Sequence, residues 1–176
     1  AAGTYTDEDG QSACKECVAG TFQSAGGKTA CNDCTAGNYC LEAAAAELPC
    51  PSGRYSSSPN LNAPGSCDEC PKGSSCATGS TAHSLCAAGT YTDEDGQSSC
   101  KECAAGTFQS VGGKTACDAC VAGYFCASGS SAPLPCNAGS YATSTSLSDA
   151  SQCTACPRGS YCVSGATAPS VCSVAN

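Results

Sequence analysis

Large apolar residues occur singly or in pairs along this chain, and Gly, Ser, Thr, Asn and Pro interrupt them every few positions. Short units recur that begin with Gly-x-aromatic, as in Gly3-Thr4-Tyr5 and Gly20-Thr21-Phe22. Aromatic residues beside threonine suit short strands, and Asp9-Gly10 is typical of the turn that ends one. The pattern therefore predicts short β-hairpins.

One segment has a different pattern. Leu41 to Leu48 contains four consecutive alanines, and alanine has the highest helix propensity. This segment predicts a short helix. The matching segment Ala127 to Leu134 contains a glycine and a proline, so we expect little helix overall and none in the framework.

The chain repeats with a period of 86 residues, since this shift superimposes all ten cysteines of the first half on the ten of the second. Ala1 to Gln11 recurs unchanged as Ala87 to Gln97. We therefore expect tandem repeats at 1–86 and 87–172, with 173–176 a tail or the start of a further repeat. The smaller units inside each repeat are too short to bury a face alone, so neighbours must stack.

Cysteine takes the place of a hydrophobic core. Isoleucine is absent, and Leu, Val and Phe fill only 15 of 176 positions, whereas cysteine occurs 20 times. A disulfide that closes a loop of about 15 residues removes roughly 3 kcal/mol of unfolded-state freedom, so several bridges can replace a core. Such bridges persist in oxidising surroundings. The composition predicts a small disulfide-rich fold, an elongated tandem array of hairpin modules without a large core, located outside the cell or on its surface.

The charge and the apolar pattern narrow the partners. A formal charge of −8, with only seven Lys and Arg, argues against binding nucleic acid or an anionic membrane. No apolar run approaches a signal-peptide core or a membrane span. We therefore expect neither nucleic-acid binding nor membrane insertion, and a mature secreted chain or a piece of something longer.

Cys50-Pro51-Ser52-Gly53-Arg54-Tyr55, followed by a polar loop and Cys67-x-x-Cys70, carries a family resemblance. It resembles the ephrin-receptor-like cysteine-rich repeat, a relative of the tumour-necrosis-factor-receptor cysteine-rich domain and loosely of the EGF-like module. Similar repeats occur in surface coats and extracellular fibres of protists and algae. The resemblance implies an extracellular, disulfide-laddered rod but no single ligand, because the same module serves receptors, stalks and structural polymers.

The family's loop closure also implies a disulfide pairing. It pairs Cys17 with Cys31, Cys34 with Cys40, Cys50 with Cys67, Cys70 with Cys76, Cys86 with Cys100, Cys103 with Cys117, Cys120 with Cys126, Cys136 with Cys153 and Cys156 with Cys162. Cys14 and Cys172 are left over. In the repeat register they correspond to Cys100 and Cys86, so we expect them to form a head-to-tail bridge between subunits, or between repeats of a longer array.

Metal binding offers two alternatives. Cys14-x-x-Cys17 with Cys31-x-x-Cys34 approaches a four-cysteine zinc site, although the further cysteines have no role in one. The acidic turns are candidates for weak calcium binding, because calcium favours clustered carboxylates; they are formed by Asp7, Glu8 and Asp9, and by Asp93, Glu94 and Asp95. No other cofactor is indicated.

Nothing in the sequence forms a catalytic constellation. His83 is the only histidine, and we expect it in an exposed loop without a nucleophile at a known catalytic spacing. The chain is therefore not expected to be an enzyme. The hydroxyl-rich stretches 56–58 and 143–148 suit exposed loops that could carry O-linked glycans.

Two functions fit these observations. A structural subunit of a filament, coat or stalk explains the insertion-free repeat, since a lattice rewards identical contacts at every step. A receptor or adhesion ectodomain that binds a protein ligand is the alternative. In either case we expect six aromatic rings to pack against neighbouring disulfides as local cores: Tyr5, Phe22, Tyr55, Tyr91, Phe108 and Tyr141.

Overall fold

The computed structural model describes residues 1–173, and its regular structure consists of two-residue strands and two short 3-10 helices. Ten two-stranded sheets occur in this range, and each joins two consecutive strands. In the first half the strands are β1 (Thr4–Tyr5), β2 (Lys15–Glu16), β3 (Thr21–Phe22), β4 (Asn32–Asp33), β5 (Asn38–Tyr39), β6 (Leu48–Pro49), β7 (Arg54–Tyr55), β8 (Asp68–Glu69), β9 (Ser74–Ser75) and β10 (Ser84–Leu85). In the second half they are β11 (Thr90–Tyr91), β12 (Lys101–Glu102), β13 (Thr107–Phe108), β14 (Asp118–Ala119), β15 (Tyr124–Phe125), β16 (Leu134–Pro135), β17 (Ser140–Tyr141), β18 (Thr154–Ala155), β19 (Ser160–Tyr161) and β20 (Ser170–Val171). The 3-10 helices are η1 (Pro64–Ser66) and η2 (Ala150–Gln152). The predicted fold class, successive hairpins with little helix, is confirmed.

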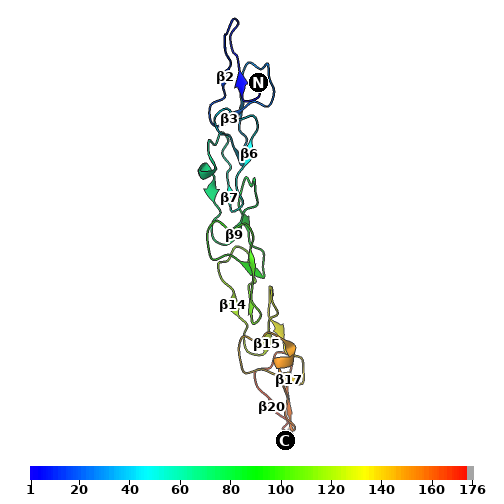
Figure 1. Cartoon of the computed structure of the whole chain (residues 1–176). Helices are drawn as coiled ribbons and strands as arrows, with labels where there is room; N and C mark the ends of the chain where they lie inside the picture. Colours follow the sequence, from blue (N-terminus) through cyan, green and yellow to red (C-terminus); the bar gives the residue numbers. More distant parts are fainter. Residues whose placement is uncertain (174–176) are drawn as a thin grey trace. The chain divides into compact units, whose positions relative to one another are not determined.

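The chain divides into two compact units. The first contains Ala1–Ser84 and Glu94–Ser99, and the second contains Leu85–Asp93 and Cys100–Asn176. Within each unit the hairpins follow one another in chain order (Figure 1). The expected tail or further repeat at 173–176 lies outside the described residues except for Ser173.

Every hairpin begins in a tight turn that requires glycine. In the second hairpin the N–H of Thr21 donates to the carbonyl of Val18 at 3.0 Å, and Gly20 between them has a φ of 93°. This is the geometry of a type II turn, whose third residue needs a positive φ. The Thr21 hydroxyl donates to the same carbonyl at 2.8 Å. The N–H of Cys34 then closes the hairpin by donating to the carbonyl of Gly20 at 3.0 Å.

Disulfides form most of the interior. Thirteen cysteines are buried in residues 1–173, and most of them have no exposed surface. In the part of the chain that is described, only Ala142 and Leu147 are buried apolar residues other than cysteine. They contact Cys136, and Phe125 packs against this cluster. No large hydrophobic core is therefore present in residues 1–173.

Each disulfide joins the cysteine that ends one hairpin to a cysteine of the next. Bridges of the short kind span six residues, and those of the long kind span 14 or 17. The nine bridges are Cys17–Cys31, Cys34–Cys40, Cys50–Cys67, Cys70–Cys76, Cys86–Cys100, Cys103–Cys117, Cys120–Cys126, Cys136–Cys153 and Cys156–Cys162. These are the pairs that the family resemblance implies. A bridge over about 15 residues contributes roughly 3 kcal/mol, so the set provides stabilisation that the apolar residues cannot.

The aromatic rings expected to form local cores are neither fully buried nor mostly exposed. Tyr5, Phe22, Tyr55, Tyr91, Phe108 and Tyr141 are all half-buried. Tyr161 is more accessible, with 55% of its surface exposed.

The predicted helix at Leu41–Leu48 is wrong. Residues 41–47 lie in the loop between β5 and β6, Leu48 begins β6, and Ala43 within the loop has a left-handed φ of 55°. A helix of eight residues would rise about 12 Å, whereas this loop must return the chain to a paired strand about 5 Å away. The hairpin and the contacts of Ala43 with an earlier hairpin outweigh the modest helix propensity of four alanines.

Candidate functional site

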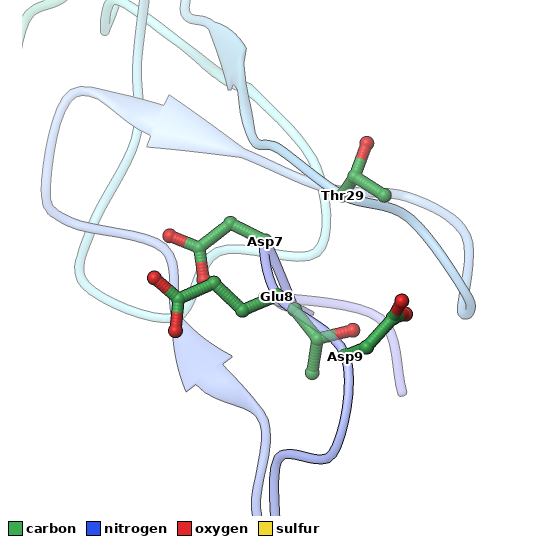
Figure 2. Close-up of a pocket in the computed structure, with 5 residues that line it drawn as sticks. Asp7, Glu8, Asp9 and Thr29 are labelled. Atoms are coloured by element: carbon green, nitrogen blue, oxygen red, sulfur yellow. The ribbon is translucent and has the colours of Figure 1, made fainter.

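The acidic turn Asp7–Gly10 lies in the loop between β1 and β2, and its three acidic residues line a pocket with Thr6 and Thr29 (Figure 2). Asp7 Oδ1 lies 2.7 Å from Lys15 Nζ. This hydrogen bond lowers the pKa of the Asp7 carboxyl and raises the pKa of the Lys15 amine. Glu8 accepts a hydrogen bond from Gln11 Nε2 at 3.1 Å. The Asp9 carboxylate has no hydrogen bond or ion pair with any residue from 1 to 173.

The three carboxylates do not converge. In Figure 2 those of Asp7 and Glu8 lie on one side of the turn and that of Asp9 extends away from them. Across residues 1–173, no three His, Cys, Asp or Glu side chains are grouped so that they could hold a metal ion. The geometry therefore gives no support to the candidate calcium sites at Asp7–Asp9 and Asp93–Asp95. Of the four cysteines considered for zinc, Cys17, Cys31 and Cys34 are in disulfides and Cys14 is a free thiol.

The same turn in the second copy shows what its third acidic residue does. Asp95 Oδ1 accepts a hydrogen bond from the backbone N–H of Lys72 at 3.0 Å. The next residue, Gly96, donates its N–H to the carbonyl of Cys70 at 2.7 Å. The carbonyl of Gln97 accepts from the N–H of Cys76 at 3.0 Å. All of these residues belong to the first unit, so the turn acts there as a docking loop.

The contact made by Gly96 recurs, and we name it the clasp. In each clasp a loop residue with a positive φ donates its N–H to the carbonyl of the cysteine that ends the hairpin two places earlier. Within residues 1–173 eight such bonds, of 2.7 to 2.9 Å, join Ala43 to Cys17, Asn60 to Cys34, Gly79 to Cys50, Gly96 to Cys70, Gly113 to Cys86, Gly129 to Cys103, Ser146 to Cys120 and Gly165 to Cys136. The clasp therefore ties each hairpin to the next but one, whereas the disulfides tie it to the next.

The clasp also explains seven of the glycines that begin hairpins. The carbonyl of the clasp residue lies directly over this glycine, so that a β-carbon on Gly20 would lie 2.6 Å from the oxygen of Asn60. The same close approach occurs at Gly3, Gly37, Gly53, Gly89, Gly106 and Gly123. The sequence pattern marks these glycines only as the starts of units. Their recurrence at the same place in both copies is the one sequence signal of their second role, which is to make room for the clasp carbonyl.

The two unpaired cysteines each stand one repeat period away from one cysteine of a bridged pair. Cys14 and Cys172 are free thiols and both are exposed. Their counterparts Cys100 and Cys86 are bridged, with their α-carbons 5.7 Å apart. Both thiols that a head-to-tail bridge requires, those of Cys14 and Cys172, are thus accessible to solvent.

His83 has more contacts than the sequence suggested. The residue is exposed, but its ring packs edge-on against Tyr55 with the centroids 5.5 Å apart. Its Nδ1 lies 3.1 Å from the hydroxyl of Ser74. These contacts give the histidine a packing role between β7 and β9.

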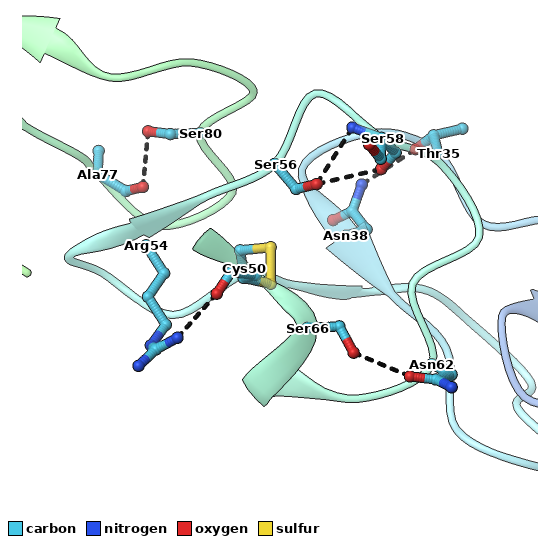
Figure 3. Close-up of a disulfide and its surroundings, with 11 residues drawn as sticks. Thr35, Asn38, Cys50, Arg54, Ser56, Ser58, Asn62, Ser66, Ala77 and Ser80 are labelled. Carbon is cyan, nitrogen blue, oxygen red and sulfur yellow. Dashed lines mark hydrogen bonds between the residues drawn. A yellow bond between two sulfur atoms is a disulfide. The ribbon is translucent and has the colours of Figure 1, made fainter. Parts of the chain in front are cut away.

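One of the expected glycan acceptors is wrong. Ser56 is 2% exposed, and its hydroxyl accepts a hydrogen bond from the N–H of Ser58 at 3.1 Å beside the Cys50–Cys67 bridge (Figure 3). A serine hydroxyl of this kind stays inside because it satisfies a nearby backbone group. Ser57 and Ser58 remain exposed.

A family model matches part of each repeat. Residues 3–47 and 89–125 match a family model described as tyrosine-protein kinase ephrin type A/B receptor-like. The two matched segments begin at Gly3 and Gly89, one repeat period apart. Comparison with curated proteins found no match.

This match and the nine disulfides indicate an extracellular, receptor-like cysteine-rich segment. The matched family is a receptor-like domain and not a class of enzymes. Neither 3-10 helix has the length or apolar character to cross a bilayer, and these are the helices of the described range.

Proposed function

We propose that this chain is a repeat subunit of an extracellular filament, coat or stalk, in which copies join head to tail through a disulfide between Cys172 and Cys14. Structures of this type in the surface coats and fibres of protists and algae are the setting that the family resemblance suggests. The chain itself contributes no chemistry to this role beyond its thiols and its repeated surface.

The observation that carries this proposal is the relation between the free and the bridged cysteines. Cys86 and Cys100 form a disulfide whose α-carbons are 5.7 Å apart. One repeat period away from them stand Cys172 and Cys14, which are both exposed and unpaired. A bridge between these two in different copies repeats a contact that the chain already makes.

The distribution of sequence identity supports the same reading. Ala1–Gln11 and Ala87–Gln97 are identical, and this segment contains the docking loop at Asp95–Gln97. Binding modules of a receptor tend to differ, since each contacts another part of its ligand. Identical docking segments suit an assembly in which each step makes the same contacts.

Non-reducing electrophoresis of the oxidised chain tests the proposal. We expect a ladder of species that collapses to one band on reduction, and peptide mapping should find Cys14 linked to Cys172. The Cys14→Ser/Cys172→Ser chain is the control and should run as a single band in both conditions. A single band of the unaltered chain, with both thiols free or bridged to each other within one molecule, would refute the proposal.

The second candidate function is a receptor or adhesion ectodomain, which the receptor-like description of the matched family favours. Electron microscopy of purified oxidised material separates the two functions. Fibres with a regular axial repeat support the structural subunit. Monodisperse short particles at every concentration support the ectodomain.

A further inference from the structure

The clasp is incomplete in the last two hairpins. The glycines that begin the first eight hairpins are all buried. Gly139 and Gly159, which begin the hairpins β17–β18 and β19–β20, are exposed. A β-carbon added to either would meet nothing within 4 Å in the described residues. The surface that receives a clasp residue is therefore present at both Gly139 and Gly159, and no clasp residue from 1–173 covers either glycine.

The first two hairpins carry the opposite half of the same contact. Gly10 and Gly27 have φ values of 74° and 70° and stand one period before the clasp residues Gly96 and Gly113. Their counterparts donate to the carbonyls of Cys70 and Cys86, whereas no backbone acceptor for the N–H groups of Gly10 and Gly27 lies in residues 1–173.

The side chains around the two faces also correspond. Asp95 accepts from the backbone N–H of Lys72, and the equivalent residues Asp9 and Arg158 are both exposed. Gly113 packs against Leu85, with its added β-carbon 3.2 Å from a methyl group. The counterpart of Leu85 is Val171, which is 78% exposed.

We propose that the first two hairpins of one copy of this chain dock on the last two hairpins of a second copy by completing these clasps. Gly10 then donates to the carbonyl of Cys156 and covers Gly139, and Gly27 does the same at Cys172 and Gly159. Asp9 accepts from the backbone N–H of Arg158. The inference rests on the proposed function and assigns the non-covalent contact that brings Cys14 to Cys172.

We infer that a second copy of this chain covers the last two hairpins, because the first two hairpins carry the residues that complete these clasps. The docking segment Ala1–Gln11 is identical to the segment that includes Asp95 and Gly96 in the first unit. The docking face and the receiving face are different surfaces, so the contact is heterologous. A pair of copies therefore still has one free docking face and one free receiving face. Contacts of this type extend into a filament when the rotation does not close a ring.

Sedimentation velocity with the Cys14→Ser/Cys172→Ser chain tests the docking without the disulfide. We expect this chain to associate reversibly as its concentration rises. Asp9→Ala on that background should raise the Kd about tenfold or more, since it removes a hydrogen bond to a charged acceptor. Asp33→Ala is the matched control: it removes the same charge at an exposed position where the second copy has Ala119, and it should leave the Kd unchanged.

The receiving face has its own matched pair. Arg158 is the second residue of a tight turn in which the N–H of Ser160 donates to the carbonyl of Pro157 at 3.2 Å, and proline suits this place in a type II turn. Arg158→Pro therefore removes the backbone donor without straining the hairpin and should weaken association about tenfold or more. Arg158→Ala keeps the N–H and should change the Kd by less than about threefold, the scale of an exposed charge.

Mixing decides whether the two faces meet. Asp9→Ala retains an intact receiving face and Arg158→Pro an intact docking face. An equimolar mixture should therefore form heterodimers with the affinity of the parent chain and stop there. Equal Kd values for Asp9→Ala and Asp33→Ala, or a mixture that associates no better than its components, would overturn the proposal. So would a parent chain that stays monomeric up to about 1 mM, because its Kd would then be weaker than about 1 mM.

The two proposals fail in different ways. In chains that keep Cys14 and Cys172, disulfide ladders that form equally fast with Asp9→Ala and with Asp33→Ala would leave the structural function intact and remove the docking contact. Reversible association of the double-serine chain without any Cys14–Cys172 bridge in the oxidised parent would retain the docking and remove the covalent filament.

Discussion

Gly53 and Gly139 form a natural matched pair for measuring what a clasp contributes. They occupy the same position in the two copies and have φ values of 80° and 88°. A β-carbon on Gly53 would overlap the carbonyl oxygen of Gly96 and lie 2.8 Å from its carbonyl carbon. A β-carbon on Gly139 would meet nothing within 4 Å among the residues described. Substitution by alanine thus imposes the same backbone strain at both sites and a clash at only one.

The expected difference follows from the contacts. Both substitutions incur the penalty of a left-handed alanine, about 1–2 kcal/mol. Gly53→Ala also displaces the carbonyl of Gly96, at an overpacking cost of roughly 1–3 kcal/mol. It further breaks the hydrogen bond from Gly96 to Cys70, worth about 0.5–1.5 kcal/mol. The clasp should therefore open more easily by about 2–4 kcal/mol, which is on the order of a hundredfold in its opening equilibrium.

Amide hydrogen exchange measures this opening residue by residue. The assay uses the Cys14→Ser/Cys172→Ser chain at low concentration, where copies are not associated. Gly53→Ala should speed exchange of the Gly96 and Cys76 amides about a hundredfold, because these donate to Cys70 and Gln97. Gly139→Ala should leave both amides unchanged. Equal effects of the two substitutions on these amides would show that strain alone, and not the clasp, accounts for the glycine.

Three further outcomes follow from the fold and the acidic turn. Full reduction under native conditions should convert the circular dichroism to that of a coil, because so little apolar area is buried; a near-native spectrum after reduction would contradict the disulfide account. Lys15→Ala should raise the pKa of Asp7 towards its ordinary value in an NMR titration, since the hydrogen bond from Lys15 is the main cause of the lowered pKa. In the unaltered chain the pair stabilises the loop above the ordinary aspartate pKa and loses this effect as the pH falls through the lowered pKa; an unchanged Asp7 titration would refute the pairing. Gln109 is 4% exposed and donates from Nε2 to the carbonyl of Ala116 at 2.9 Å, so Gln109→Ala should destabilise its hairpin by about 1–3 kcal/mol in local exchange, and an effect below about 0.5 kcal/mol would contradict a buried role.

The 86-residue repeat and its hairpin unit can both be predicted from the amino-acid sequence. Gly-x-aromatic followed by a polar turn specifies a hairpin because its signals are local: a glycine with positive φ, a two-residue strand and a turn such as Asp9-Gly10. The cysteine count required disulfides in place of a core. The pairs themselves came from the family resemblance, since spacing leaves many connectivities open.

The contacts that join hairpins that are not neighbours could not be predicted from the sequence and are seen in the folded chain. Leu41–Leu48 has a helical composition, yet Ala43 is drawn into a left-handed conformation because its N–H bonds to the carbonyl of Cys17 at 2.8 Å. The role of Asp95 was equally hidden, because its partner is a backbone N–H of Lys72, 23 residues earlier. Backbone groups look alike at every position, so a sequence carries no mark of which carbonyl a distant N–H will meet. Residue preferences express local geometry, and the clasp is a long-range contact between main chains.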